Sequence, residues 1–444
     1  MPRAKLRASS KAPSPPAPGS RNVHNQATNF SVLKRDPHAL VLHVFKDLNC
    51  YDVRRYLDNN MHIDKSRIVE ITKELIKYKS FTGMEKGVGD YISGFFDKIG
   101  VEYRVFEKEK GRPNIIANLG SGEKTLAFNG HFDVVPISDE SSWETDPFSP
   151  ELKGNRLFGR GAFDMKGSCA VMMHIAEILS KEKLNGNLQI QLVSDEEKGA
   201  EFGTRHIIEL IEKGEIKRPD HVIIGEGSDL KIRNGERGIL VFDVKFKGKA
   251  AHTANVRSDA INAIVLASKA VLAIDKKIDK FHPEIGTPVI SVNMISGGKV
   301  KNQVPGECVI TVDRRTIPGE TKEKVLGEIK QQIDKVLENG SYEILNVLYG
   351  PANITSKDSP FIKLVAETIM DVLKIKPEFY IGEGGVTDAR FYRYAGIPTI
   401  IYGPLGEHAH GPNEYVDVDS LEKQAKVYLG LVNRTMGSDL LEKT

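Results

Sequence analysis

The sequence has few cysteines, little excess of charge and no long apolar run. Cys50, Cys169 and Cys308 are too few and too far apart for a disulfide framework, so we expect a reducing compartment, the cytoplasm. A net charge of only +2 argues against nucleic acid or a membrane surface as a partner. No stretch approaches the ~18 consecutive apolar residues of a membrane span, and no apolar segment of the secretory type follows the N-terminus.

Length and composition indicate a globular protein of two domains behind an unusual N-terminal segment. The chain has 444 residues, too many for one hydrophobic core, and 40% of them are hydrophobic. Up to Arg35 there are seven basic residues and no acidic one, and proline and serine cluster at 12–20. Residues 1–60 are therefore expected to be a disordered basic extension. A dispensable extension is favoured over an organelle transit peptide, the alternative for such a composition.

Apolar patterning divides the remaining chain. Over 61–238 and again over 351–444, apolar runs alternate with helical patterns, which predicts an α/β catalytic domain around a largely parallel mixed sheet. Its first helix should begin at the N-cap Asp64. Over 239–350 the expected order is β-α-β-β-α-β, with helices at 259–276 and 321–337, which is ferredoxin-like. We therefore expect an inserted α+β lid or dimerisation domain.

Residues of the kind that bind metals concentrate where predicted strands end. His131 and Asp133 are two residues apart, so both point to one face of a strand, and one can orient the other. Asp164 lies in a glycine-rich turn, where a carboxylate can bridge two cations. Each pattern alone also fits ordinary surface residues.

Three further segments add ligands. Adjacent Glu196 and Glu197 follow an apolar strand, and one could bind metal while the other acts as a base. Glu226 follows the next strand, and His408 and His410 offer two imidazoles near the C-terminus. Side chains at the carboxyl ends of parallel strands meet at one edge of the sheet, so these segments together predict one site.

Three motifs in this order resemble a known family. They are Gly-His-x-Asp-Val-Val-Pro at 130–136, Gly-Arg-Gly-x-x-Asp-x-Lys-Gly at 159–167, and the Glu-Glu pair. They are similar to those of the di-zinc metallopeptidases that include acetylornithine deacetylase, succinyl-diaminopimelate desuccinylase, aminoacylase and carboxypeptidase G. The likeness runs from about residue 64 to 435. It implies a homodimeric enzyme that cuts an amide in an N-acyl amino acid or short peptide.

The resemblance also implies roles for individual residues. The metal ligands would be His131, Asp164, Glu197, Glu226 and His410. Two Zn²⁺ ions are implied, with Co²⁺ as a substitute; His131 and Glu226 would hold one ion, Glu197 and His410 the other, and Asp164 would bridge them. Asp133 would orient His131, Glu196 would be the general base, and the peptide after Asp164 would be cis.

Other matched residues would bind the substrate. His252 of the inserted domain would reach the active site of the partner subunit and stabilise the oxyanion. Asn302 and Arg315 would hold the substrate carboxylate, and Thr387 lies in a matching substrate loop at 384–391.

The substrate itself is less sharply indicated. The motif at 130–136 and the Glu-Gly-Ser at 226–228 favour a succinyl-diaminopimelate desuccinylase of lysine biosynthesis. Acetylornithine deacetylase, a dipeptidase or a carboxypeptidase are the alternatives. Two positions depart from the desuccinylase pattern: Gly227 replaces proline, and Glu236-Arg237 replaces paired arginines. A non-catalytic binding protein would lack a ligand residue, and none is missing.

Overall fold

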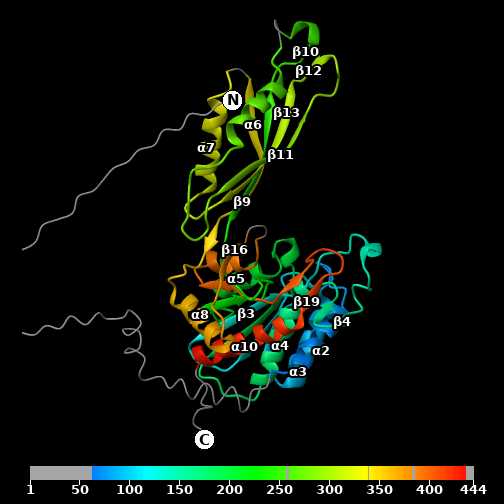
Figure 1. Ribbon diagram of the computed structural model, residues 1–444, viewed down its shortest axis with the longest axis vertical. Helices are drawn as coiled ribbons and strands as arrows, with labels where there is room; N and C mark the ends of the chain where they lie inside the picture. Colours follow the sequence, from blue (N-terminus) through cyan, green and yellow to red (C-terminus); the bar gives the residue numbers. More distant parts are fainter. Residues whose placement is uncertain (1–62, 257–259, 339, 383–385, 437–444) are drawn as a thin grey trace, which may run out of the picture. The chain divides into compact units, whose positions relative to one another are not determined.

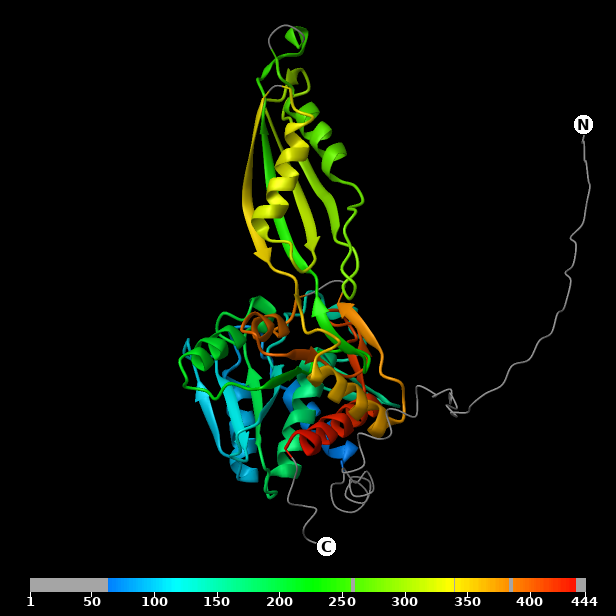
Figure 2. The same cartoon turned by 90° about the vertical axis from the view of Figure 1, so that its left-hand side faces the viewer.

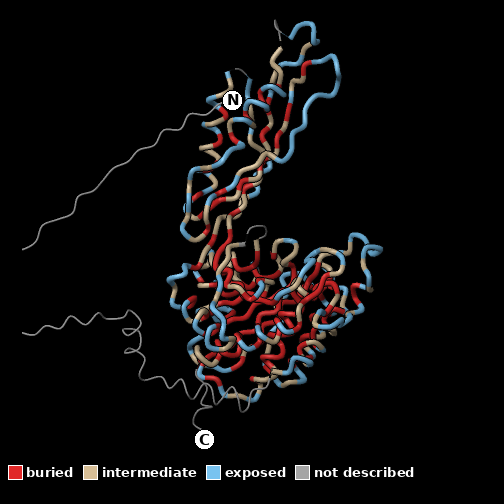
Figure 3. Tube along the Cα trace, viewed as in Figure 1, coloured by how far each residue is buried: buried red, intermediate tan, exposed pale blue. Residues whose placement is uncertain are grey.

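A computed structural model describes residues 63–256, 260–338, 340–382 and 386–436 (Figures 1 and 2). The extension expected at 1–60 lies outside the described residues, as do Gly384 and Gly385 of the expected substrate loop. The described buried residues concentrate within a large α/β body and within a smaller antiparallel body, and each body has a hydrophobic core of its own (Figure 3).

The α/β body is built on a nine-stranded sheet. The order is β1-β2-β6-β3-β7-β17-β8-β15, with β16 also paired to β8. The strands are β1 (Tyr103–Phe106), β2 (Asn114–Leu119), β3 (Thr125–His131), β6 (Asn187–Val193), β7 (His221–Ile224), β8 (Ile232–Glu236), β15 (Asn353–Ile354), β16 (Phe379–Gly382) and β17 (Thr399–Ile401). β3 is parallel to β6 and β7, and β17 is parallel to β7, whereas β1, β2 and β15 pair antiparallel. The predicted mixed sheet with a parallel centre is confirmed.

Helices cover both faces of this sheet, which explains why its central strands β3 and β6 are buried at every residue. On β3, Leu126 and Phe128 pack into the core formed with α2 (Lys65–Ile76), α3 (Lys86–Ile99), α4 (Gly167–Leu179), α8 (Pro360–Leu373) and α10 (Val418–Met436). Ala127, between them, packs into the core formed with α5 (Thr204–Glu212) and α9 (Ala389–Tyr394). Alternate side chains of one strand therefore serve two cores.

The first described helix begins where its sequence predicts. The Asp64 side chain accepts hydrogen bonds from the backbone N–H groups of Ser66 and Arg67. Such a cap contributes about 1 kcal/mol to helix stability. Ile68 and Leu75 lie on the buried face of α2.

The smaller body is a four-stranded antiparallel sheet with two helices. Its order is β11-β13-β9-β14. The elements are β9 (Gly238–Lys247), α6 (Ala263–Ile274), β11 (Val289–Gly297), β13 (Glu307–Thr316), α7 (Lys322–Asp334) and β14 (Ser341–Gly350). The ferredoxin-like prediction is confirmed. The helix predicted over 259–276 is shorter, since the Asn262 side chain accepts from the N–H of Ile264 and α6 starts there.

Two small sheets complete the topology. One has the order β18-β19-β5-β4 and consists of β4 (Glu151–Lys153), β5 (Arg156–Phe158), β18 (Gly406–Glu407) and β19 (Tyr415–Asp417). It joins the segment before Asp164 to the segment around His410. The other pairs β10 (Ala251–His252) with β12 (Gln303–Val304). Among the described helices, none combines the length and the apolar character needed to cross a bilayer.

Candidate metal centre

The five predicted ligands lie at the ends of strands or in the turns that follow them. His131 is the last residue of β3, Glu197 lies in the short helix after β6, and Glu226 follows β7. Asp164 lies in the turn at Ala162–Lys166, and His410 lies between β18 and β19. Because β3, β6 and β7 are parallel neighbours, their carboxyl ends deliver three of these side chains to one edge of the sheet.

Asp164 is central to the cluster. Its Oδ1 lies 3.0 Å from His131 Nε2, and its Oδ2 lies 3.0 Å from His410 Nε2. Glu226 Oε1 lies 3.4 Å from the same nitrogen of His131, and Glu197 Oε2 lies 3.0 Å from the same nitrogen of His410. Two half-sites therefore share one carboxylate. The peptide from Asp164 to Met165 is cis, as expected.

The electrostatics of the cluster show a site with more negative charge than its protein surroundings balance. Burial, followed by the charge of Asp164, raises the pKa of Glu226 to about 7. Burial also raises the pKa of Glu196 well above its usual range. Hydrogen bonds to Asp164 and Glu197 raise the pKa of His410 to about 10. Bound protons thus offset part of the negative charge of the carboxylates. Divalent cations would offset that charge in place of the protons when they bind.

The donor set fits borderline divalent cations. Ligand atoms of His131, Asp164 and Glu197 lie within 4.8 Å of one another, as do those of His131, Glu196 and Glu226. Imidazole and carboxylate ligands of this kind suit Zn²⁺ and similar metals. The His131 side chain is 1% exposed and that of His410 is 54% exposed, so the cluster opens to solvent on the His410 side.

Asp133 connects the ligand from β3 to both glutamates. It is fully buried, and its carboxylate accepts from the N–H of Glu196 at 3.1 Å and of Glu197 at 3.3 Å. Thr82 donates its hydroxyl to the same carboxylate at 2.8 Å. The Nδ1 of His131 lies 3.1 Å from the Asp133 backbone oxygen and 3.5 Å from its carboxylate. One residue thereby fixes the imidazole and the turn that carries the Glu-Glu pair.

Glu414 has a structural part in the centre that the sequence did not suggest. Its Oε1 accepts from the N–H groups of Phe163 and Asp164, both at 3.0 Å. Its Oε2 accepts from the N–H of Gly161 at 2.9 Å and from Arg160 Nη1 at 2.5 Å. Glu414 is fully buried, and burial raises its pKa. The turn that carries Asp164 is therefore wrapped around this carboxylate.

Three of the four predicted substrate residues, His252, Asn302 and Arg315, belong to the chain segment of the smaller body. His252 is exposed on β10, where it pairs with Gln303 of β12. The backbone oxygen of Asn302 accepts a hydrogen bond from the N–H of Thr253. Arg315 on β13 donates to Asp313 at 2.8 Å. Within the described residues, no hydrogen bond or ion pair joins His252 or Asn302 to the five ligands.

Thr387 is held by a buried glutamate. Its hydroxyl donates to Glu236 Oε1 at 2.7 Å, and its N–H donates to the same oxygen at 3.2 Å. Arg233 also donates to this oxygen, at 2.9 Å. Glu236 is fully buried, so the residue that replaces an arginine of the desuccinylase pattern neutralises charge inside the α/β body.

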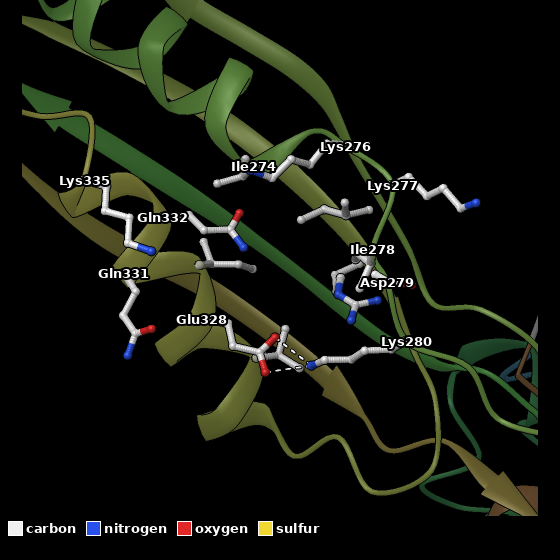
Figure 4. Close-up of a pocket in the computed structure, with 14 residues that line it drawn as sticks. Ile274, Lys276, Lys277, Ile278, Asp279, Lys280, Glu328, Gln331, Gln332 and Lys335 are labelled. Atoms are coloured by element: carbon white, nitrogen blue, oxygen red, sulfur yellow. Dashed lines mark hydrogen bonds and ion pairs between the residues drawn. The ribbon is translucent and has the colours of Figure 1, made fainter.

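A separate cavity lies in the smaller body, between α6, the connection after it and α7 (Figure 4). Its volume is about 340 Å³. Two of its basic groups are paired, since Lys280 Nζ lies 2.6 Å from Glu328 and 3.0 Å from Glu320, and Arg314 lies 2.7 Å from Glu320. None of the predicted ligands lines it, so the chemistry belongs to the cluster around Asp164.

Ligand clusters at the carboxyl edge of a parallel sheet are typical of metal-dependent hydrolases, the class that the fold and the cluster together define. Within it, the chain belongs to peptidase family M20/M25/M40, whose model matches residues 127–434. It is a hydrolase that acts on amide bonds.

Curated relatives match most of the chain. A succinyl-diaminopimelate desuccinylase of Orientia tsutsugamushi (strain Ikeda) is 32% identical over 383 residues, which cover 82% of this chain and 95% of the relative. A succinyl-diaminopimelate desuccinylase of Phenylobacterium zucineum (strain HLK1) is 28% identical over 376 residues, which cover 82% of this chain and 97% of the relative.

Solved structures share the fold. Aminopeptidase PepT of Bacillus cereus superposes with a TM-score of 0.69 at 19% identity, over 84% of this chain and 99% of that one. The metallo-carboxypeptidase Sso-CP2 of Sulfolobus solfataricus superposes with a TM-score of 0.65 at 22% identity, and the match covers 83% of this chain and 99% of that one. The Bacillus subtilis protein YXEP, described as a dinuclear metal-binding peptidase, has a TM-score of 0.64 at 17% identity. The match covers 83% of this chain and 97% of that one.

Proposed function

We propose that the protein is a succinyl-diaminopimelate desuccinylase, which releases succinate and a free amine from an N-succinyl amino acid in lysine biosynthesis. The observation that carries the proposal is the meeting of five ligands from distant segments beside the half-buried Glu196. The names of relatives at 28–32% identity supply the substrate. The buried, unpaired thiols Cys169 and Cys308 fit the cytoplasm as its location.

We assign one cation to His131 and Glu226 and a second to Glu197 and His410, with Asp164 shared between them. Two Zn²⁺ ions suit this set, and Co²⁺ is their proposed substitute. When bound, such ions polarise the amide carbonyl and lower the pKa of water. Asp133 and Glu414 keep the ligand-bearing turns in place through their backbone hydrogen bonds.

Glu196 supplies the proton transfers. Its carboxylate takes a proton from the attacking water while the water oxygen bonds to the amide carbon. It then gives that proton to the leaving nitrogen as the carbon–nitrogen bond breaks, so that succinate and the amine leave.

The remaining residues are assigned to substrate binding. His252, from the partner subunit, donates to the carbonyl oxygen as negative charge develops there. Arg315 pairs with the substrate carboxylate, and Asn302 and Thr387 orient the substrate. We propose that residues 61–238 and 351–444 form the catalytic domain and that 239–350 form the dimerisation domain, since each has its own core.

The edge strand β11 supports the proposed homodimer. On it, Met294 is 66% and Ile295 is 55% exposed, although both are apolar. The Met294→Lys/Ile295→Lys variant should be monomeric, because charges on an unpaired edge block pairing of strands. It should keep its metals and lose about 100- to 1,000-fold in kcat as His252 is withdrawn. Sedimentation velocity, metal content and kcat test this.

The opposite edge of the same sheet provides the control. Leu348 on β14 is 58% exposed, and Leu348→Lys should leave the oligomeric state and kcat unchanged. A wild-type protein that sediments as a monomer with full activity would remove the partner's His252 from the proposal.

A substrate panel tests the proposed activity. With added Zn²⁺, kcat/KM should be highest for N-succinyl-diaminopimelate, at least about 100-fold above N-acetylornithine and dipeptides, because a missing carboxylate leaves a site's buried polar groups unpaired. A chelator should abolish the activity, and Zn²⁺ should restore it. A higher kcat/KM for N-acetylornithine or a dipeptide would reassign the substrate. If none of the substrates were hydrolysed in a metal-dependent way, the protein would be assigned as a non-catalytic binding protein.

A further inference from the structure

Phe163, the residue before Asp164, lies against two glycines from other ligand-bearing segments. A Cβ atom on Gly227 would lie 2.2 Å from Cζ of the Phe163 ring, and one on Gly406 would lie 2.4 Å from its Cδ2. Ordinary carbon contacts are about 3.5–4.0 Å, so the ring occupies the space that a side chain at Gly227 would need. At Gly406 the ring shares this role with the backbone oxygen of Tyr415, 2.5 Å from the added Cβ. Neither glycine has a positive φ, so space and not backbone conformation requires a glycine at both positions.

These three residues belong to three of the five segments that carry the candidate ligands. Gly227 directly follows Glu226, and Gly406 lies four residues before His410. Hydrogen bonds already join the two glycine segments: the N–H of Gly403 donates to the Ser228 hydroxyl at 2.8 Å, and the N–H of Ser228 donates to the Pro404 oxygen at 3.3 Å. The half-buried ring therefore lies against two loops that hydrogen bonds join to each other.

We propose that Phe163 is a positioning residue that sets the spacing between Asp164, Glu226 and His410, and so the affinity and geometry of the metal site. The ring acts through the ligands and needs no contact with the substrate. Asp164 and Glu226 share one nitrogen of His131, at 3.0 and 3.4 Å, so a shift of the ring changes both distances together. This inference rests on the proposed metal centre.

A double-mutant cycle on the full chain, titrated with Co²⁺, tests it. Gly227→Ala should weaken Co²⁺ binding by about 10- to 100-fold and change the visible spectrum of the bound ion, because the added methyl group displaces the ring. Phe163→Ala should weaken Co²⁺ binding by about tenfold, because the ligand-bearing loops lose the ring that spaces them. In the Phe163→Ala background, Gly227→Ala should cost less than about twofold, since the clash is gone.

Gly94→Ala is the matched control, since no atom lies within 4 Å of the added Cβ on α3, and its Co²⁺ affinity should equal the wild type's. Should Gly227→Ala alone not fold, recovery of folded, Co²⁺-binding protein in the double variant is the expected result. An equal cost of Gly227→Ala with and without the ring, or a double variant that does not fold, would overturn the role of Phe163 alone. Wild-type protein that binds no Co²⁺ would overturn the proposed metal centre, and this inference with it.

Discussion

Glu196→Gln is expected to lower kcat by about 100- to 10,000-fold while the protein retains its metals. The amide has nearly the shape of the carboxylate but does not accept the proton of the attacking water. Asp133 holds the turn through the backbone N–H of Glu196, which the substitution leaves intact. Turnover of N-succinyl-diaminopimelate with saturating Zn²⁺, together with metal content, measures both parts of the expectation.

The neighbouring residue supplies the control for that experiment. Glu197 lies 3.0 Å from His410 Nε2, so Glu197→Gln should lose metal, and excess Zn²⁺ should restore part of its activity. Glu196 also lies among ligand atoms, with His131 and Glu226. Comparable metal loss in both variants would therefore make Glu196 a ligand and leave the base unassigned.

Local patterns predicted the alternation of strands and helices because helices bury both faces of the central strands, which therefore contain many apolar residues. Within 61–238, where apolar runs predicted strands, β2 and β7 are such runs and are buried over most of their residues, as expected for strands between two layers of helices. The helix predicted from 259 failed at its start. There the side chain of Asn262 caps the backbone, and a local cap overrides the apolar periodicity.

The sequence placed the candidate ligands on the correct edge of the sheet but could not show how they are held there. Phe163 and Glu414 are separated by 251 positions, and the hydrogen bond between them depends on how the small sheet pairs β5 with β19. Glu414 follows a Gly-Pro-Asn sequence that reads as an ordinary turn. Its function as a buried acceptor is visible only after the chain has folded.

Both departures from the desuccinylase pattern have physical reasons in the structure. Gly227 replaces proline, and a larger residue there would overlap the Phe163 ring. Glu236 replaces an arginine, and its buried carboxylate accepts hydrogen bonds from Arg233 and Thr387. Neither departure removes a ligand from the cluster, so they bear on fit and specificity and leave the hydrolytic machinery intact.

Glu414→Gln is expected to weaken Zn²⁺ binding by about 10- to 100-fold and to destabilise the fold by about 3–5 kcal/mol. The loss of stability follows because Arg160, itself only 2% exposed, would keep a buried charge without its partner. The loss of affinity follows because an amide group offers one acceptor oxygen in place of two. The N–H groups of Gly161, Phe163 and Asp164 would then compete for it.

Arg160→Met separates these two effects. It breaks the same ion pair but leaves the Glu414 carboxylate on the N–H groups of Phe163 and Asp164. Both variants should therefore show similar midpoints of denaturant unfolding without metal, whereas only Glu414→Gln should show strongly weakened Zn²⁺ binding in a competition titration. Equal Zn²⁺ affinities at equal stability would mean that Glu414 acts only by neutralising Arg160. The position of Asp164 would then be set by the β5–β19 pairing instead of by this carboxylate.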